Sequence, residues 1–213
     1  MKESTSKEKI LKAIRNALTE TDHSKKIMDI DTKTSIFPPI EEFPEVHFAK
    51  RLEQNHGRFI YCTNVFEAMI NLKHIITENK YDSIYTNEPD IEHFLKESEI
   101  IYFNYEQGLK KVQAVITLCE CLVARFGSVV MSSRLLTGRK AHTVPEAHIV
   151  IAFRGQIFNE ISSAFQFLKN KYGNEMPSMI TFITGPSRTD AIHGEFVYGV
   201  NGATNLYVLY IDI

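Results

Sequence analysis

The residues best suited to bind a ligand form one short run near the carboxyl end of the chain. The run reads Thr184, Gly185, Pro186, Ser187, Arg188 and Thr189. Glycine lets a backbone approach a ligand closely, and proline commonly opens a helix as its first residue. The start of a helix exposes backbone N–H groups, and hydroxyls and a guanidinium add donors for a carboxylate or phosphate. The run therefore predicts an anion site.

This anion site is expected at the carboxyl end of a strand, because the apolar residues 179–183 come directly before the run. Open α/β folds commonly bind ligands at that end of a strand. A structural interpretation explains the same residues as a tight strand-to-helix turn with a capping serine and a surface arginine. The sequence contains neither a Walker A motif nor GxGxxG, so no complete general motif decides between the two.

Cysteine and histidine patterns predict no metal site. Cys119 and Cys121 flank Glu120, but no second cysteine pair provides further ligands, and two small buried residues are the simpler interpretation. None of the eight histidines forms HExxH. His142 and His148 are expected to be surface or capping residues.

Other charged or titratable residues are further candidates for the site. His193 follows it closely and can titrate near neutral pH, so it is an additional candidate. The basic residues Arg134, Arg139 and Lys140 either attract an anion or belong to a solvated loop. Glu120 and Glu146 are the acids of the central region that could act as a nucleophile opposite the anion site, and neither lies in a recognisable motif.

Alternating helices and strands must position these residues. Helices are expected over 5–20, 45–55, from Asn64 onward, 89–97 and 159–172, with strands at 58–62, 83–86, 100–103, 112–118, 128–132, 148–153, 179–183, 195–200 and 206–211. This alternation predicts an α/β fold with a mostly parallel sheet flanked by helices. Asn201-Gly202 has the composition of a hairpin turn that joins the last two strands.

The amino-terminal part is expected to be separate from this α/β domain. Residues 1–44 are interpreted as a helix followed by a polar, proline-containing linker, and residues 45–213 as the domain. The helix carries an apolar stripe with which an oligomer could form.

The run at residues 183–189 resembles the carboxyl-terminal signature of the LUD-domain family, the lactate utilisation protein C group. The stretches 127–135, 145–150 and 199–202 are similar to other parts of that family, although only the signature run is specific. The resemblance implies a fold like CoA transferases and ribose-phosphate isomerases. It also implies a cytoplasmic role in bacterial oxidation of L-lactate to pyruvate with separate iron–sulfur partner proteins. In this interpretation Gly127, Ser128, Asn201 and Gly202 frame the anion site.

The sequence also departs from the family pattern. Arg125 replaces an acid, Asn201 replaces a histidine, and His193 stands where the family has a glutamate. We therefore expect a divergent member whose ligand differs, with Arg125 as a second anion contact beside Arg188.

Composition excludes several other classes of protein. The 213 residues include 24 Lys and Arg against 26 Asp and Glu, a net charge of -2, so no basic excess favours nucleic acid or an anionic membrane. No apolar run reaches the roughly 18 residues of a membrane span, and no secretory signal is visible. Three cysteines suit a reducing cytoplasm and are too few for a cluster held by four thiolates.

Three functions stay open from the sequence. The leading one is a lactate-utilisation component that binds a small anionic metabolite and holds no cofactor of its own. The second is a stand-alone enzyme acting on a phosphorylated or CoA-linked small molecule, which needs a nucleophile opposite the anion site. The third is a non-catalytic binding or assembly module, which the altered cleft residues favour over the second.

Overall fold

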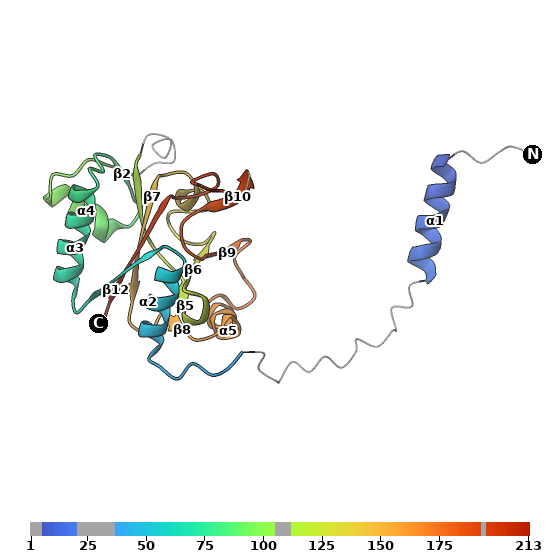
Figure 1. Ribbon diagram of the computed structural model, residues 1–213, viewed down its shortest axis with the longest axis horizontal. Coiled ribbons are helices and arrows are strands. Elements are labelled where there is room, and N and C mark those ends of the chain that lie inside the picture. The colour runs from blue at the N-terminus through green and yellow to red at the C-terminus, as the bar shows by residue number, and fades with distance from the viewer. Residues whose placement is uncertain (1–5, 21–36, 105–111, 193–194) are drawn as a thin grey trace, which may run out of the picture. The chain divides into compact units, whose positions relative to one another are not determined.

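The computed structural model describes residues 6–20, 37–104, 112–192 and 195–213 (Figure 1). The chain divides into two units, Met1–Pro39 and Ile40–Ile213. In the first unit, α1 (Ser6–Glu20) confirms the expected helix, and its apolar residues Ile10, Leu11 and Ile14 are exposed. Thr5, at which the helix is expected to begin, and most of the expected linker lie outside the described residues.

A six-stranded sheet forms the centre of the second unit. Its strands are β1 (Arg58–Cys62), β12 (Asn205–Ile211), β7 (Ala147–Phe153), β4 (Ala114–Leu118), β2 (Ile84–Tyr85) and β3 (Tyr102–Phe103), in that spatial order. Every neighbouring pair is parallel. The predicted α/β fold with a mostly parallel sheet is therefore confirmed.

A second sheet packs on one face of the first. It consists of β8 (Ile157–Phe158), β5 (Cys121–Val123), β6 (Ser128–Ser132) and β9 (Ile180–Ile183). β6 pairs antiparallel with β5 on one side and with β9 on the other, whereas β8 runs parallel to β5. β6 and β9 lie where the sequence predicts strands, whereas β5 and β8, with only three and two residues, were not predicted.

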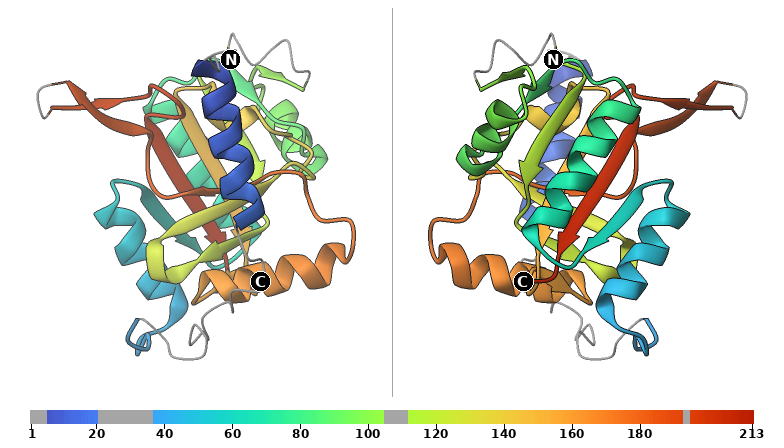
Figure 2. Two further views of the ribbon diagram at one scale, coloured as in Figure 1. Left: turned by 90° about the vertical axis from the view of Figure 1, so that its right-hand side faces the viewer. Right: turned by 90° about the vertical axis from the view of Figure 1, so that its left-hand side faces the viewer.

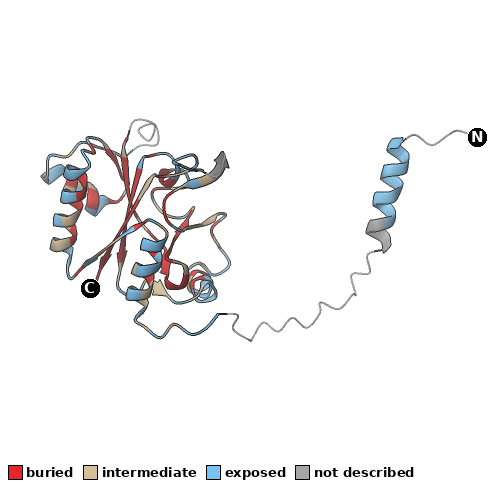
Figure 3. Cartoon of the chain, in the orientation of Figure 1, coloured by how far each residue is buried: buried red, intermediate tan, exposed pale blue. Residues whose placement is uncertain are grey.

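Alternating side chains of both sheets build three packed layers of core. One face of the main sheet packs against α3 (Val65–Glu78) and α4 (Pro89–Glu97). Its other face packs against the second sheet and against Phe48 and Leu52 of α2 (Pro44–Gln54). The outer face of the second sheet packs against α5 (Ile161–Tyr172). Buried residues accordingly concentrate on the strands, while the helices keep exposed outer faces (Figure 3).

Several helix ends form as their sequences predict. The Asn64 side chain accepts a hydrogen bond from the Glu67 amide at 2.9 Å and caps α3. Pro89 opens α4. The end of α2 is less regular, since His56 adopts a positive φ although a glycine, Gly57, follows it. Gly57 instead leaves room for Leu52, whose Cδ1 would lie 2.5 Å from a Cβ at that position.

Three expectations about the carboxyl-terminal half are wrong. No helix follows Pro186, because β10 (Arg188–Ile192) and β11 (Glu195–Tyr198) pair as an antiparallel hairpin that projects from the body (Figure 2). Asn201-Gly202 joins no hairpin, since β12 enters the main sheet between β1 and β7. The helix expected over 159–172 begins at Ile161, with Glu160 as its N-cap residue.

No helix among the described residues has both the length and the apolar character needed to cross a membrane.

Candidate functional site

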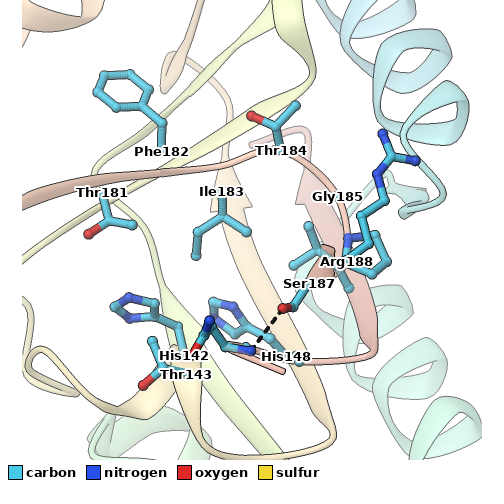
Figure 4. A pocket seen from close by; sticks show the side chains of 15 residues that line it. His142, Thr143, His148, Thr181, Phe182, Ile183, Thr184, Gly185, Ser187 and Arg188 are labelled. Atoms are coloured by element: carbon cyan, nitrogen blue, oxygen red, sulfur yellow. Dashed lines mark hydrogen bonds between the residues drawn. The ribbon is translucent and has the colours of Figure 1, made fainter. Parts of the chain in front are cut away.

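A cavity of about 430 Å³ lies where β7 and β12 begin, beside the turn that follows β9 (Figure 4). Its described lining residues are His142, Thr143, His148, Thr181, Phe182, Ile183, Thr184, Gly185, Pro186, Ser187, Arg188, Asn201, Gly202, Ala203 and Leu206. The signature turn and the Asn201-Gly202 loop thus form adjoining parts of one pocket wall. The pocket lies at the carboxyl end of β9, as expected, but at the amino ends of the main-sheet strands.

Ser187 fixes the signature turn to the loop before β12. The Ser187 amide donates to the Ala203 carbonyl at 2.8 Å, and the Ser187 carbonyl accepts from the Gly199 amide at 2.9 Å. The Ser187 hydroxyl oxygen accepts from the Asn201 amide at 3.2 Å. The amide of Ser187 is therefore used within the protein, and the array of free N–H groups expected from a helix start does not form. The hydroxyl proton of Ser187 can still be donated to a ligand.

The two glycines expected to admit a ligand instead admit the end of α2. Gly185 has a φ of +81°, and a Cβ there would lie 2.1 Å from the Asn55 carbonyl oxygen. Gly127 has a φ of +64°, and its Cβ would lie 2.4 Å from the Leu52 amide nitrogen. Gly127 does not line the pocket. Both positions need glycine for backbone conformation and for close packing.

The remaining predicted residues differ in whether they line the pocket. Ser128 lies behind the turn, with its hydroxyl 2.7 Å from that of Thr184. Thr189 belongs to β10 and does not line the pocket. Arg188 is exposed, and Figure 4 shows its side chain extending away from the pocket histidines. His193 lies outside the described residues.

Arg125 is not brought to the pocket. Its side chain is buried, and its Nε donates to both carboxylate oxygens of Glu160, at 2.7 and 2.9 Å. The carboxylate hydrogen bonds raise the pKa of the guanidinium further. Because Glu160 neutralises this charge, the structure does not support Arg125 as a second anion contact beside Arg188.

His142 and His148 are buried and line the pocket, so the expectation of surface or capping residues is wrong for both. The two residues are 6% and 1% exposed, and their ring centroids lie 6.2 Å apart. His148 Nε2 lies 2.9 Å from the Thr117 hydroxyl oxygen, whereas Nδ1 of neither ring has a hydrogen-bond partner among the described residues. One sequence signal was available. In a strand, His148 lies on the same face as Val150 and Ala152, which predicts that its side chain points into the protein.

Burial controls the charge of this histidine pair. It lowers the pKa of His142, and it lowers the pKa of His148 to about 3, with a smaller contribution from the charge of His142. Both rings are consequently neutral at pH 7. Each offers one N–H donor and one ring nitrogen acceptor.

Glu120 lies inside the protein and not in the pocket. Its fully buried carboxylate accepts hydrogen bonds from Lys171 at 2.7 Å, Tyr172 at 2.6 Å and Ser132. Burial alone would raise its pKa, but these donors together lower it. Glu146 is exposed and also does not line the pocket. Neither acid is placed opposite the signature turn as a nucleophile.

The cysteines are free and buried, and burial raises the pKa of the Cys121 thiol to about 12. Over the part of the chain that the structure describes, no three His, Cys, Asp or Glu side chains are grouped to hold a metal ion.

Comparison with known proteins agrees with the resemblance carried by residues 183–189. Lactate utilization protein C 1 of Bacillus mycoides is 26% identical over 171 residues, covering 76% of this chain and 70% of that protein. Lactate utilization protein C of Bacillus subtilis is 31% identical over 113 residues, about half of each chain. A solved DUF162 family protein from Deinococcus radiodurans superposes with a TM-score of 0.61 at 15% identity, covering 82% of this chain and 99% of that one. The model of the LUD domain matches residues 46–211, and the chain therefore belongs to the LUD domain family.

Proposed function

We propose that this protein is a lactate-utilisation-C-like component that supports the oxidation of L-lactate to pyruvate with separate iron–sulfur proteins. In this role it binds a small anionic metabolite in the pocket beside residues 184–188. The names of its relatives support the pathway. The observation that carries the binding role is that the family's signature turn forms a wall of this pocket.

The chemistry of the pocket favours binding over covalent catalysis on a CoA-linked substrate. No carboxylate or thiol is found among the described residues that line it. Glu120 is held by Lys171 and Tyr172 in the interior. Arg188 is the only permanent charge among the described lining residues, which suits a singly charged ligand better than a phosphorylated one.

Gene deletion tests this proposal directly. A strain that lacks the gene should fail to grow on L-lactate, grow normally on glucose, and recover when the full chain is supplied. The tagged chain should also co-purify with cysteine-rich iron–sulfur proteins from lactate-grown cells. Undiminished growth on L-lactate, in a strain that carries no second copy, would contradict the proposal.

A further inference from the structure

The strand β1 forms an unprotected edge of the main sheet. Its residues Arg58–Cys62 pair in unbroken parallel register with β12, and no strand in the described part of the chain pairs with its other edge. Natural sheets usually protect an edge by a very short strand, a bulge, a proline or a charge. The opposite edge follows this rule, since β3 has only two residues. β1 has neither a bulge nor a proline, and its only charge lies at its first residue, so its open edge suits pairing with another strand.

The direction of the backbone groups of β1 identifies the residues that an added strand would meet. The Asp212 amide, directly after β12, donates to the Cys62 carbonyl at 2.9 Å, so the backbone groups of Cys62 face β12. Successive residues of a strand direct their N–H and C=O groups to opposite sides. Ile60 therefore also faces β12, whereas Phe59 and Tyr61 direct their backbone groups to the open edge. An added strand would hydrogen-bond to these two residues.

The side chains beside this edge are apolar and partly exposed. Phe59 and Tyr61 lie on the face that α2 covers, and each ring packs against Tyr210. With Val46 and Ala49 of α2 they line a hollow of about 320 Å³, which three charged side chains of α2 also line. Tyr61 and Val46 are 47% and 44% exposed. A second strand would cover this apolar surface and add an aromatic pair across the new ladder.

Charge favours β1 of a second copy, in antiparallel orientation, as the added strand. Glu67 lies at the Cys62 end of β1, since its carboxylate accepts hydrogen bonds from the Thr63 amide and hydroxyl, both at 2.7 Å. Arg58 lies at the other end, over the Tyr207 ring on the face that α3 covers. It is exposed and forms no ion pair with a described residue. Antiparallel pairing brings Arg58 of each copy toward Glu67 of the other, whereas parallel pairing would bring like charges together.

We propose that two copies of this chain join through β1, so that their main sheets form one continuous sheet across a two-fold axis at Ile60. In this register Phe59 of each copy lies opposite Tyr61 of the other, and the two residues exchange backbone hydrogen bonds. The contact is isologous, so it closes as a dimer and uses both open edges. None of the described pocket-lining residues belongs to β1 or α2, so the dimer does not depend on the proposed function.

Analytical ultracentrifugation of the full chain tests the dimer. The unmodified protein should sediment with twice the 24.4 kDa of one chain. Tyr61→Lys places a charge beside the new ladder and should weaken the dimer at least about tenfold. The matched control is Ile101→Lys, because Ile101 is also exposed but lies directly before β3, at the opposite edge. It should leave the dimer unchanged. A monomeric unmodified chain, or equal weakening by both variants, would overturn the inference.

Disulfide cross-linking tests the register. The two copies of Ile60 form a pair without backbone hydrogen bonds between them, and such a pair has Cα atoms about 4.5 Å apart. That spacing lies within the range of a disulfide. Ile60→Cys should therefore form covalent dimers under mild oxidation, whereas the control Ile101→Cys should not. The three native cysteines are buried, so they should add little background.

The two measurements together separate β1 from other contact surfaces. Circular dichroism checks that each variant is folded, and the mass of the unmodified chain needs no variant at all. A dimer that Tyr61→Lys does not weaken and Ile60→Cys does not cross-link would be formed by another surface, such as the apolar stripe of α1. A chain that stays monomeric and pairs only with a different protein would have another occupant on this edge. Either result would refute the proposed dimer.

Discussion

A single buried imidazole makes the stability of this protein depend on pH. The pKa of His148 falls to about 3 in the folded protein, chiefly because burial disfavours the charged ring. In the unfolded chain the pKa returns to about 6.5. Between these values the unfolded chain binds a proton that the folded protein does not. The free energy of unfolding should therefore decrease as the pH falls from about 6.5 toward 3, by up to about 1.4 kcal/mol per pH unit for this one group.

Urea unfolding at pH 7, 6 and 5 measures this slope. Other groups titrate in the same range, so the informative quantity is the difference between the unmodified protein and His148→Gln. That variant should lose less stability between pH 7 and 5, by about 1–2 kcal/mol. Parallel pH profiles for the two proteins would show that His148 is not kept neutral by burial.

A second prediction at the scale of single residues concerns Gly185. Its φ of +81° is unfavourable for other residues, and a Cβ would meet the Asn55 carbonyl oxygen at 2.1 Å. Gly185→Ala should therefore cost at least about 2 kcal/mol, from backbone strain and overpacking together. Gly138 is the matched control, because its φ is +65° and a Cβ there would meet nothing within 4 Å. Gly138→Ala should cost only about 1 kcal/mol. Chemical unfolding measures both, and equal losses would contradict the packing explanation.

Gly185 and His148 also show how far the sequence could define the site. The sequence located the turn and its glycine correctly, but it could not tell whether a ligand or a helix end would approach that glycine. His148 lies on the same strand face as two apolar residues, which predicts an inward side chain. Its position beside His142, however, depends on a tertiary contact between a strand and a turn. Local patterns specify conformation, whereas the identity of a distant neighbour comes only from the fold.

At the scale of elements, α5 is held to the second sheet by an ion pair at each end. Glu160 at its start pairs with Arg125, and Lys171 in its last turn pairs with the buried Glu120. Lys171→Met would leave the Glu120 carboxylate with only its hydroxyl donors. Because Lys171 is itself partly exposed, the loss should be about 1–3 kcal/mol, below that of a fully buried pair.

The control for Lys171→Met is Lys50→Met, which removes an exposed pair with Glu42 and should change stability by less than about 1 kcal/mol. Thermal and urea unfolding compare the two variants. Equal effects would show that α5 is held by apolar packing alone.

The predicted elements were most accurate where the sequence carried long patterns or clear end signals. The boundaries of β1 and β6 match their expected ranges. The residues after Pro186 were interpreted as a helix because proline and hydroxyls suit a helix start. Pairing with β11 decided otherwise, and that pairing lies outside any local window. β5 and β8 were too short to give a pattern.

At the scale of the whole molecule, the sequence predicted a mostly parallel sheet but not its strand order. β12 is the last strand in the chain, and it lies between the edge strand β1 and β7 in the main sheet. Its continuous apolar run is typical of a strand buried on both faces. This insertion carries the Asn201-Gly202 loop against the signature turn. The pocket therefore depends on the order of strands in the sheet. The sequence could identify residues of the turn and of the loop, but it could not show that the two meet around a cavity.

The last prediction concerns the independence of the α/β unit. All residues of the four buried clusters belong to the unit Ile40–Ile213. Removal of residues 1–39 should therefore shift the melting temperature by less than about 2 °C, since less than about 0.5 kcal/mol of folding energy is lost. Circular dichroism melts of the full chain and of a chain beginning at Ile40 make the comparison. Size-exclusion chromatography of both chains tests whether the apolar stripe of α1 forms an oligomer. A melting temperature lower by more than about 5 °C would show that the amino-terminal segment contributes to the fold, either in its own chain or through a second copy.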